Sequence, residues 1–160
     1  MRIAVVAVGR LKAGPERELA DRYGKRIAAG AKALGLAGPD IRELDESRAR
    51  QPDIRKREEA RAISTALPPG AVRVALDERG RDWTSEEFAD FLRRSRDGGR
   101  PLGFVVGGPD GLDPDFLLQA DVRLRFGAMT VPHGLARVLL LEQIYRAATI
   151  LSGHPYHRGG

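Results

Sequence analysis

The sequence predicts an α/β fold in which a mostly parallel sheet carries helices on both faces. Short apolar runs alternate with longer amphipathic segments, which is typical of this class. The runs Ile3–Val8 and Leu102–Val106 are apolar throughout, as expected of parallel strands that are buried on both faces. Between the apolar runs lie segments with helical spacing and helix-capping residues. These three observations define the expected architecture.

Local signals place the remaining elements. Thr84 and Glu87 have the spacing of a capping box and begin a helix that ends at Gly98-Gly99. Asp113-Pro114 supplies a cap and a first-turn proline for a short helix. In chain order, the other expected elements are a helix over Pro15–Leu34, a weak strand over Ile41–Leu44, a charged helix over Asp53–Leu67, a strand over Val72–Leu76, a half-exposed strand over Val122–Phe126 and a long helix over Leu135–Leu151.

Length and composition limit the class of protein. A chain of 160 residues without an internal repeat or linker is expected to form one domain, residues 1–160. The sequence contains no cysteine, which excludes disulfides and thiolate zinc sites and fits a reducing cytoplasm. No apolar run approaches the roughly 20 residues of a membrane span, so a cytoplasmic protein is expected. The net charge of +5 is compatible with an RNA partner and equally with an ordinary basic protein.

A glycine-rich segment, Gly107-Gly108-Pro109-Asp110-Gly111, directly follows the apolar strand 102–106. Ligands of open α/β sheets bind at the carboxyl ends of strands, where glycine lets the backbone come close to the ligand. The alternative is a tight turn without a ligand. Neither the G-x-G-x-x-G fingerprint nor a P-loop is present, which argues against an ordinary dinucleotide site and against an NTPase.

Two further segments precede the chain end. The stretch 126–133, FGAMTVPH, can wrap a ligand with its backbone, or it is simply a strand–helix connection. The helix 135–151 is apolar around most of its circumference, so we expect one side to pack on the sheet and another on a second subunit. Glu142 and Arg146 form an i, i+4 pair in this apolar setting, with a partly exposed salt bridge as the plainer interpretation.

The chain ends in His154-Pro155-Tyr156-His157-Arg158. Two histidines without a third ligand argue against a metal site. Tyrosine and histidine offer stacking faces for an unpaired base, while arginine pairs with phosphate, so an RNA contact is one interpretation. A frayed terminus is the other, and composition does not choose between them.

Taken together, these segments resemble the ribosomal large-subunit RNA methyltransferase H family of the knotted SPOUT superfamily. The resemblance covers the whole chain and is carried by VAVGR, LDERGRDWTSEEFA, FVVGGPDGL, MTVPHGLARVLLLEQIYRA and HPYHR. It implies a C-terminal trefoil knot, which general topology rules would not suggest. It also implies a homodimer that uses S-adenosyl-L-methionine to methylate the N-3 position of a pseudouridine in 23S ribosomal RNA on the assembled ribosome.

The resemblance also assigns residues. A serine is common in this family where Gly127 stands here, so a hydroxyl contact is missing. The cofactor-binding residues implied are Leu76, Gly107, Gly108, Gly127, Ala128, Met129, Thr130, Val131 and Pro132. The substrate-binding residues implied are His133, Arg137, His154, Tyr156, His157 and Arg158, and the catalytic residues are Glu142, His157 and Arg158.

Two other functions fit the same segments. One is a SPOUT methyltransferase that acts on another RNA, such as transfer RNA. The other is a knotted RNA-binding module without catalysis. The intact GGPDG and MTVPH loops argue against the non-catalytic module, which a test of cofactor binding would identify. Only substrate assays on ribosomes and transfer RNA separate the two methyltransferases.

Overall fold

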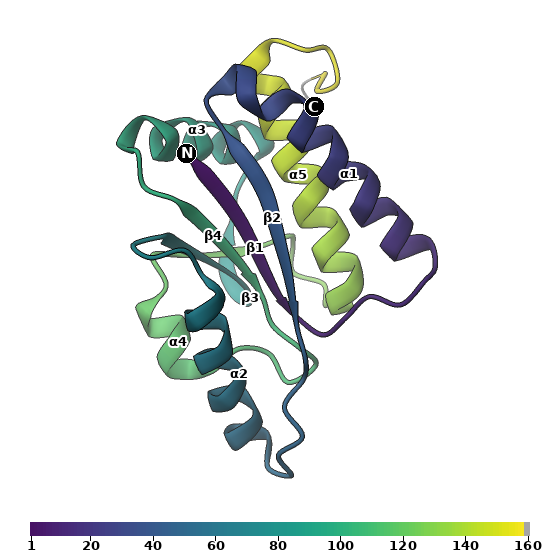
Figure 1. Cartoon of the computed structure of the whole chain (residues 1–160), viewed down its shortest axis with the longest axis vertical. Helices are drawn as coiled ribbons and strands as arrows, with labels where there is room; N and C mark the ends of the chain where they lie inside the picture. Colours follow the sequence, from purple (N-terminus) through teal and green to yellow (C-terminus); the bar gives the residue numbers. More distant parts are fainter. Residues whose placement is uncertain (159–160) are drawn as a thin grey trace.

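The computed structural model describes residues 1–158, in which five strands form one sheet with the order β2-β1-β4-β3-β5 (Figure 1). All four pairings are parallel. The strands are β1 (Arg2–Val8), β2 (Ala37–Leu44), β3 (Val72–Asp82), β4 (Leu102–Val106) and β5 (Val122–Arg125). The helices are α1 (Pro15–Ala31), followed by a 3-10 turn (Lys32–Leu34), α2 (Pro52–Ala66), α3 (Ser85–Gly98), α4 (Pro114–Gln119) and α5 (His133–Ser152).

The two apolar runs form the centre of the sheet. β1 lies between β2 and β4, and its residues Ile3 to Val8 have no exposed surface. β4 lies between β1 and β3 and is buried along its whole length. The predicted parallel α/β sheet is therefore confirmed, and continuous apolar runs mark the strands that are covered on both faces.

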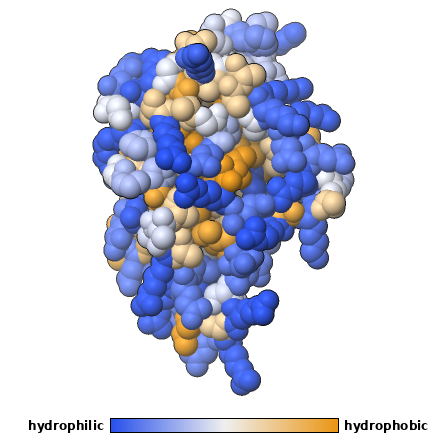
Figure 2. Space-filling model, viewed as in Figure 1, coloured by the Kyte–Doolittle hydropathy of each residue, from blue (hydrophilic) through white to orange (hydrophobic). Residues whose placement is uncertain are grey.

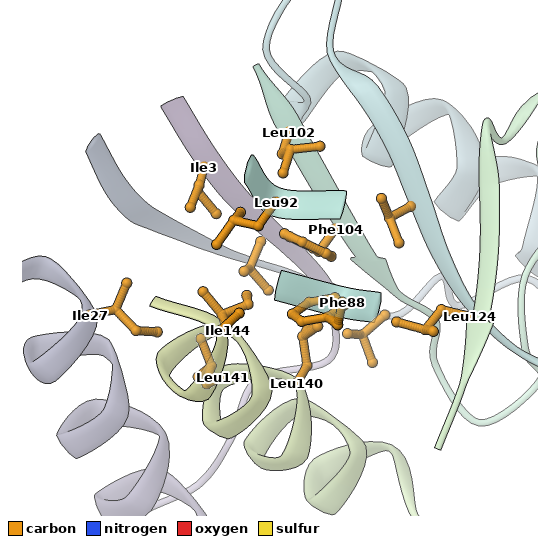
Figure 3. Packing of buried hydrophobic residues seen from close by; sticks show 14 of the residues in the cluster. Ile3, Ile27, Phe88, Leu92, Leu102, Phe104, Leu124, Leu140, Leu141 and Ile144 are labelled. Atoms are coloured by element: carbon orange, nitrogen blue, oxygen red, sulfur yellow. The ribbon is translucent and has the colours of Figure 1, made fainter. Parts of the chain in front are cut away.

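Helices cover both faces of the sheet, as expected. α1, α3 and α5 pack together on one face, with α5 between the other two. Figure 3 shows Leu140, Leu141 and Ile144 of α5 meeting Phe88 of α3 and Phe104 of β4 in this core. α2 and α4 lie on the opposite face and enclose a second, smaller apolar cluster (Figure 1).

The predicted helix starts are confirmed at the level of single hydrogen bonds. The Thr84 side chain accepts from the Glu87 amide, and the Glu87 carboxylate accepts from the Thr84 amide, which completes the capping box. The Asp113 side chain accepts from the Phe116 amide at the start of α4. α3 and α5 end at Gly99 and Gly153, both in the left-handed conformation that glycine adopts without strain.

Helix boundaries differ from those expected by up to three residues, and the boundaries of β2, β3 and β5 differ as well. β3 does not end at Leu76 but continues to Asp82, after a register shift between Leu76 and Arg81 on β5. A Cβ atom at Gly80 would lie 2.7 Å from the Leu124 backbone, so only glycine permits this close pairing. β5 ends at Arg125 rather than Phe126, and β2 begins at Ala37, because pairing with neighbouring strands extends or cuts what the apolar pattern indicates.

The surface is mostly hydrophilic in the view of Figure 2, with separated hydrophobic patches. The large apolar side chains that stay exposed include Leu135 at 44% and Leu139 at 39% on α5, and Met129 at 88% in the loop before it. Within residues 1–158, no helix has the length and apolar character that a membrane span requires. The expected trefoil knot stays a prediction.

Candidate functional site

A cleft of about 860 Å³ opens at the carboxyl edge of the sheet, beyond the ends of β3, β4 and β5. This is where open α/β sheets bind ligands, and the size is that of small-molecule sites. The cleft brings together nearly all residues that the sequence analysis expected at a cofactor: Leu76, Gly107, Gly108, Gly127, Met129, Thr130, Val131 and Pro132 line it, together with His133. Ala128 belongs to the same loop but is not among the lining residues.

The loop 107–111 forms one wall of the cleft. Its backbone turns back on itself, because the Gly111 amide donates to the Gly108 carbonyl at 3.0 Å. A Cβ atom at Gly108 would lie 3.1 Å from Val8, so a larger residue would push this wall away from β1. Asp110 accepts a two-pronged hydrogen bond from Arg55 of α2, with Nε–Oδ2 and Nη2–Oδ1 distances of 2.8 and 3.0 Å. The loop is therefore held by α2 as well as by the sheet.

A buried carboxyl group lies behind this wall. Glu59 of α2 is 6% exposed and accepts a hydrogen bond from the Ser47 amide. One of its oxygens would lie 3.7 Å from a Cβ atom at Gly108. Burial raises the pKa of Glu59, because leaving water disfavours the charged form. The loop 107–111 therefore packs against a carboxyl group that is costly in free energy to ionise.

The loop 126–132 forms the opposite wall. Arg125 pairs with Asp82 through two hydrogen bonds of 2.9 and 2.8 Å, which ties the base of the loop to β3. Gly127 has φ +118°, a backbone conformation that other residues rarely adopt, and no atom lies within 4 Å of the position of a Cβ. The wall therefore depends on the backbone freedom of Gly127 rather than on lack of space.

Arg137 of α5 is placed differently from its expected role. Its side chain is 2% exposed, and its guanidinium binds Glu43 of β2 and the Gly9 carbonyl at the end of β1. Burial opposes ionisation of Glu43, but its hydrogen bonds from Arg17, Leu11 and Arg137 outweigh this effect and lower its pKa. Arg137 thus fastens the start of α5 to the sheet, and its cationic group is not offered to an external ligand.

The tail 154–158 lies at the other end of α5 and is docked on its own subunit (Figure 1). Glu142 is the centre of this contact, since it accepts hydrogen bonds from the Tyr156 hydroxyl at 3.0 Å and from Arg146 at 2.6 and 3.0 Å. Burial raises the pKa of Tyr156, with Tyr23 and Glu142 adding to the shift, so its hydroxyl keeps its proton and donates. Hydrogen bonds between tail side chains and residues of the same subunit therefore hold the tail in place, so it is not frayed.

His157 adds a second anchor. Its Nδ1 lies 3.2 Å from an Arg146 nitrogen, and its Nε2 lies 2.8 Å from Glu86 of α3. Arginine can only donate, so we assign Nδ1 as the acceptor and Nε2–H as the donor to Glu86. This bond lowers the pKa of Glu86. His154 accepts from the Tyr156 amide at 3.2 Å, and Arg158 is exposed.

A second hollow, of about 590 Å³, lies beside the tail. It is lined by Trp83, Thr84, Ser85, Glu86, Arg146, Tyr156, His157 and Arg158. The rings of Tyr145 and Tyr156 meet edge to face at 4.7 Å, and the Arg146 guanidinium lies 4.8 Å from the centre of the Tyr156 ring. This end therefore offers an aromatic and cationic surface, whereas the cleft offers glycine and backbone.

The two parts of the expected site are separate within one subunit. The cleft lies at the first turn of α5, at His133 and Ala136, whereas the tail folds back on Glu142 and Arg146, about 14 and 20 Å further along the helix. The cofactor residues are thus brought together, while Glu142, Tyr156, His157 and Arg158 gather elsewhere. Within the described chain, no group of three or more His, Asp or Glu side chains could hold a metal ion.

Two residues at the cleft were missed by the sequence analysis. Arg55 lies 55 positions before its partner Asp110, and nothing in the local pattern indicates that pairing. Asp77 directly follows Leu76 and also lines the cleft. A carboxylate placed at the end of a predicted strand could have drawn attention to it.

Comparisons with known proteins agree with this geometry. Residues 1–157 match the family described as predicted SPOUT methyltransferases. The ribosomal RNA large subunit methyltransferase H of Allorhizobium ampelinum is 55% identical, with 99% of each chain aligned. The protein of the same name from Nitrobacter hamburgensis is 56% identical over 99% of this chain and 100% of its own. A probable methyltransferase from Bordetella pertussis Tohama I has the same fold, with a TM-score of 0.53, 15% identity and coverage of 92% of this chain and 93% of its own.

Proposed function

The chain belongs to the family of SPOUT methyltransferases, and on this premise we propose that it transfers a methyl group from S-adenosyl-L-methionine to ribosomal RNA of the large subunit. The observation that carries the proposal is the full-length similarity, at 55% and 56% identity, to proteins named for that reaction. The finer proposal is that the acceptor is the N-3 position of a pseudouridine in 23S ribosomal RNA, methylated on the assembled ribosome in the cytoplasm.

The cleft fits the proposed cofactor. Gly107 and Gly108 let a flat ring approach the backbone closely, and the run 127–132 adds amides and carbonyls on the other side. Asp77 contributes a buried carboxylate oxygen without a partner. When bound, S-adenosyl-L-methionine supplies a methyl group on a positively charged sulfur, which the ring nitrogen takes up as the carbon–sulfur bond breaks and the nitrogen loses its proton.

We propose that the active unit is a homodimer. The tail of one subunit docks on Glu142 and Arg146, about 14–20 Å along α5 from its own cleft. Leu135 and Leu139 are exposed apolar residues one turn apart on α5, and burying them against a second α5 removes apolar surface from water. A two-fold pairing through this surface uses the same patch on both subunits and can bring the tail of one to the cleft of the other.

The tail residues are proposed to place the RNA. Tyr156 and His154 offer ring faces to an unpaired base, and exposed Arg158 can meet a phosphate. His133, at the mouth of the cleft, is proposed as a further contact to RNA. We leave Arg137 out of the substrate-binding set, because Glu43 and Gly9 occupy its guanidinium.

Positioning is proposed as the main source of rate. Glu142 has its oxygens occupied by Arg146, Tyr156 and Gln143, so it acts by holding the tail. Of the expected catalytic residues, His157 is then the one proposed to take the proton, on Nδ1, after this atom leaves Arg146. Correct orientation of two reactants can lower the activation barrier by up to about 7–11 kcal/mol. We therefore expect the placement of the pseudouridine against the methyl group to matter more than the strength of the base.

The test is methylation of ribosomes from a strain that lacks the modification, followed by mapping of the modified nucleotide. We expect one methyl group, on a pseudouridine of the large subunit. Methylation of transfer RNA in place of ribosomes would show that the substrate is a different RNA. Absence of cofactor binding at millimolar S-adenosyl-L-methionine would support a non-catalytic RNA-binding module.

Arg158→Ala tests the role of the tail in the same assay. We expect turnover to fall while cofactor affinity, measured by calorimetry, stays unchanged, since Arg158 lies away from the cleft. Arg22→Ala, an exposed arginine of α1, is the matched control and should leave both values unchanged. Unchanged turnover in Arg158→Ala would remove Arg158 from the site.

A further inference from the structure

Asp77 holds an unusual position among the acidic residues. It follows Leu76 in the part of β3 that reaches the carboxyl edge of the sheet, where the register with β5 shifts. It lines the same cleft as Gly108 and Thr130. A side chain at this place is held by the strand rather than by a mobile loop.

The Asp77 carboxylate has no partner. Its Oδ2 atom is buried and receives no hydrogen bond from any residue of 1–158. The buried carboxyls elsewhere are all satisfied: Glu59 accepts from Ser47, and Asp113 accepts from Phe116. Leaving a buried polar atom unpaired costs free energy, and native structures rarely do so without a reason.

The cationic side chains near Asp77 have other partners and do not neutralise its carboxylate. Arg123 lines the cleft but donates from Nε to the Leu117 carbonyl, and Arg125 pairs with Asp82. The other buried unpartnered atom found in the described chain, Nε of Arg137, belongs to a guanidinium whose two other nitrogens are bound. Asp77 is different, because neither of its oxygens has a hydrogen bond or an ion pair.

We infer that Asp77 is a cofactor-recognition residue, whose carboxylate accepts a hydrogen bond from an N–H or O–H group of the bound cofactor. The inference rests on the proposed function, since it requires S-adenosyl-L-methionine in this cleft. An ionised carboxylate only accepts, so it selects a donor at that point of the ligand. The donors of the cofactor lie in its adenosine half and in its amino-acid half.

The experiment is calorimetric titration of the wild-type protein and Asp77→Asn with S-adenosyl-L-methionine. We expect the affinity of Asp77→Asn to fall by about ten-fold or more, as for loss of a hydrogen bond to a charged group. Asp115→Asn, the same change at an exposed position of α4 that does not line the cleft, should bind like wild type. Affinity of Asp77→Asn within two-fold of wild type would overturn the inference.

Two further ligands tell the halves of the cofactor apart. 5′-Methylthioadenosine retains the adenosine half, and S-adenosylhomocysteine retains both halves without the charge on sulfur. A loss for all three ligands assigns the donor to the adenosine half, while a loss for S-adenosyl-L-methionine and S-adenosylhomocysteine alone assigns it to the amino-acid half. A loss for S-adenosyl-L-methionine alone would replace the hydrogen bond by attraction to the sulfonium and overturn the inference as stated.

Thermal unfolding without ligand separates recognition from a structural role. Asp77→Asn removes the charge from a half-buried carboxylate whose buried oxygen has no partner, so we expect its Tm to equal or exceed that of wild type even though it binds more weakly. A lower Tm together with weaker binding would assign Asp77 to the fold. Wild-type protein that binds none of the three ligands would instead reject the proposed cofactor site itself.

Discussion

The two ends of α5 are built in opposite ways. At its first turn, the cleft is formed by glycine-rich loops and contains the unpaired carboxylate of Asp77. From its middle onward, Glu142 and Arg146 hold Tyr156 and His157 of the tail through hydrogen bonds. The cleft thus contains a polar atom that lacks a hydrogen-bond partner when no ligand is bound. The polar groups that hold the tail are paired with one another, so the tail can offer a ligand only its exposed surface. Changes at the cleft should act on cofactor affinity, and changes at the tail should act on turnover.

The largest effect on turnover is expected from Glu142→Gln. This variant tests whether a change at the tail acts on turnover and leaves cofactor affinity unchanged. The amide keeps one oxygen for Arg146 and Tyr156, but it loses the negative charge of the ion pair with Arg146, and its NH2 group cannot accept from Gln143, so the anchor of the tail is weakened. Hydrogen bonds to charged groups contribute about 1.5–3 kcal/mol each, which corresponds to a fall in turnover of about ten- to a hundred-fold. Turnover on ribosomes and calorimetric cofactor affinity measure the two ends separately.

Asp90→Asn is the control for that variant. Asp90 pairs with Arg93 and Arg94 on the exposed side of α3, so it makes the same kind of contact without reaching the tail. We expect wild-type turnover for Asp90→Asn. If Glu142→Gln lowered cofactor affinity as well, the separation of the two ends would be wrong.

An intermediate effect is expected from Gly127→Ser, which restores the residue common in the family. A serine at φ +118° is strained by about 1–3 kcal/mol, which lowers Tm by a few degrees. Because Gly127 lines the cleft, cofactor affinity should fall too. Gly70→Ser, at φ +71° in a turn that also has space for a side chain, should lower Tm without changing affinity. Tighter cofactor binding by Gly127→Ser would mean that the hydroxyl contact outweighs the strain.

The smallest effects are expected in the pH dependence of stability, with opposite signs at the two ends. The raised pKa of Glu59 means that its neutral form is favoured on folding, so stability is full below the unfolded pKa and declines as pH rises through the folded pKa. The lowered pKa of Glu86 means that its contribution is present above the unfolded pKa and is lost as pH falls through the folded pKa.

Glu59→Gln and Glu86→Gln test these signs by thermal unfolding between pH 3 and pH 8. Relative to wild type, we expect Glu59→Gln to gain stability as pH rises and Glu86→Gln to lose it. Glu18→Gln, an exposed residue of α1, should follow the wild-type curve throughout. Parallel curves for Glu59→Gln and wild type would mean that the charge behind the cleft wall has no cost.

Much of the fold follows from local pattern. Ile3–Val8 and Leu102–Val106 identify the central strands by continuous apolar character, and the Thr84–Glu87 capping box locates the start of α3 within one residue. These features depend on neighbours in the chain, so the sequence alone determines them. The residues expected at the cofactor also cluster, since Leu76 lies on β3 before its register shift, the others follow β4 or β5, and parallel strands end at one edge.

The sequence by itself determined the parallel α/β class, the apolar helix α5 and the glycine loops after the strands. Only the tertiary structure decided that Arg137 would bind Glu43, 94 residues away, and that one oxygen of Asp77 would be buried without a partner. It also decided that the tail folds back on Glu142 and Arg146 instead of reaching its own cleft. The physical reason is that spacing along the chain controls turns, caps and faces, whereas partners distant in sequence meet only when the sheet order and helix packing bring them together.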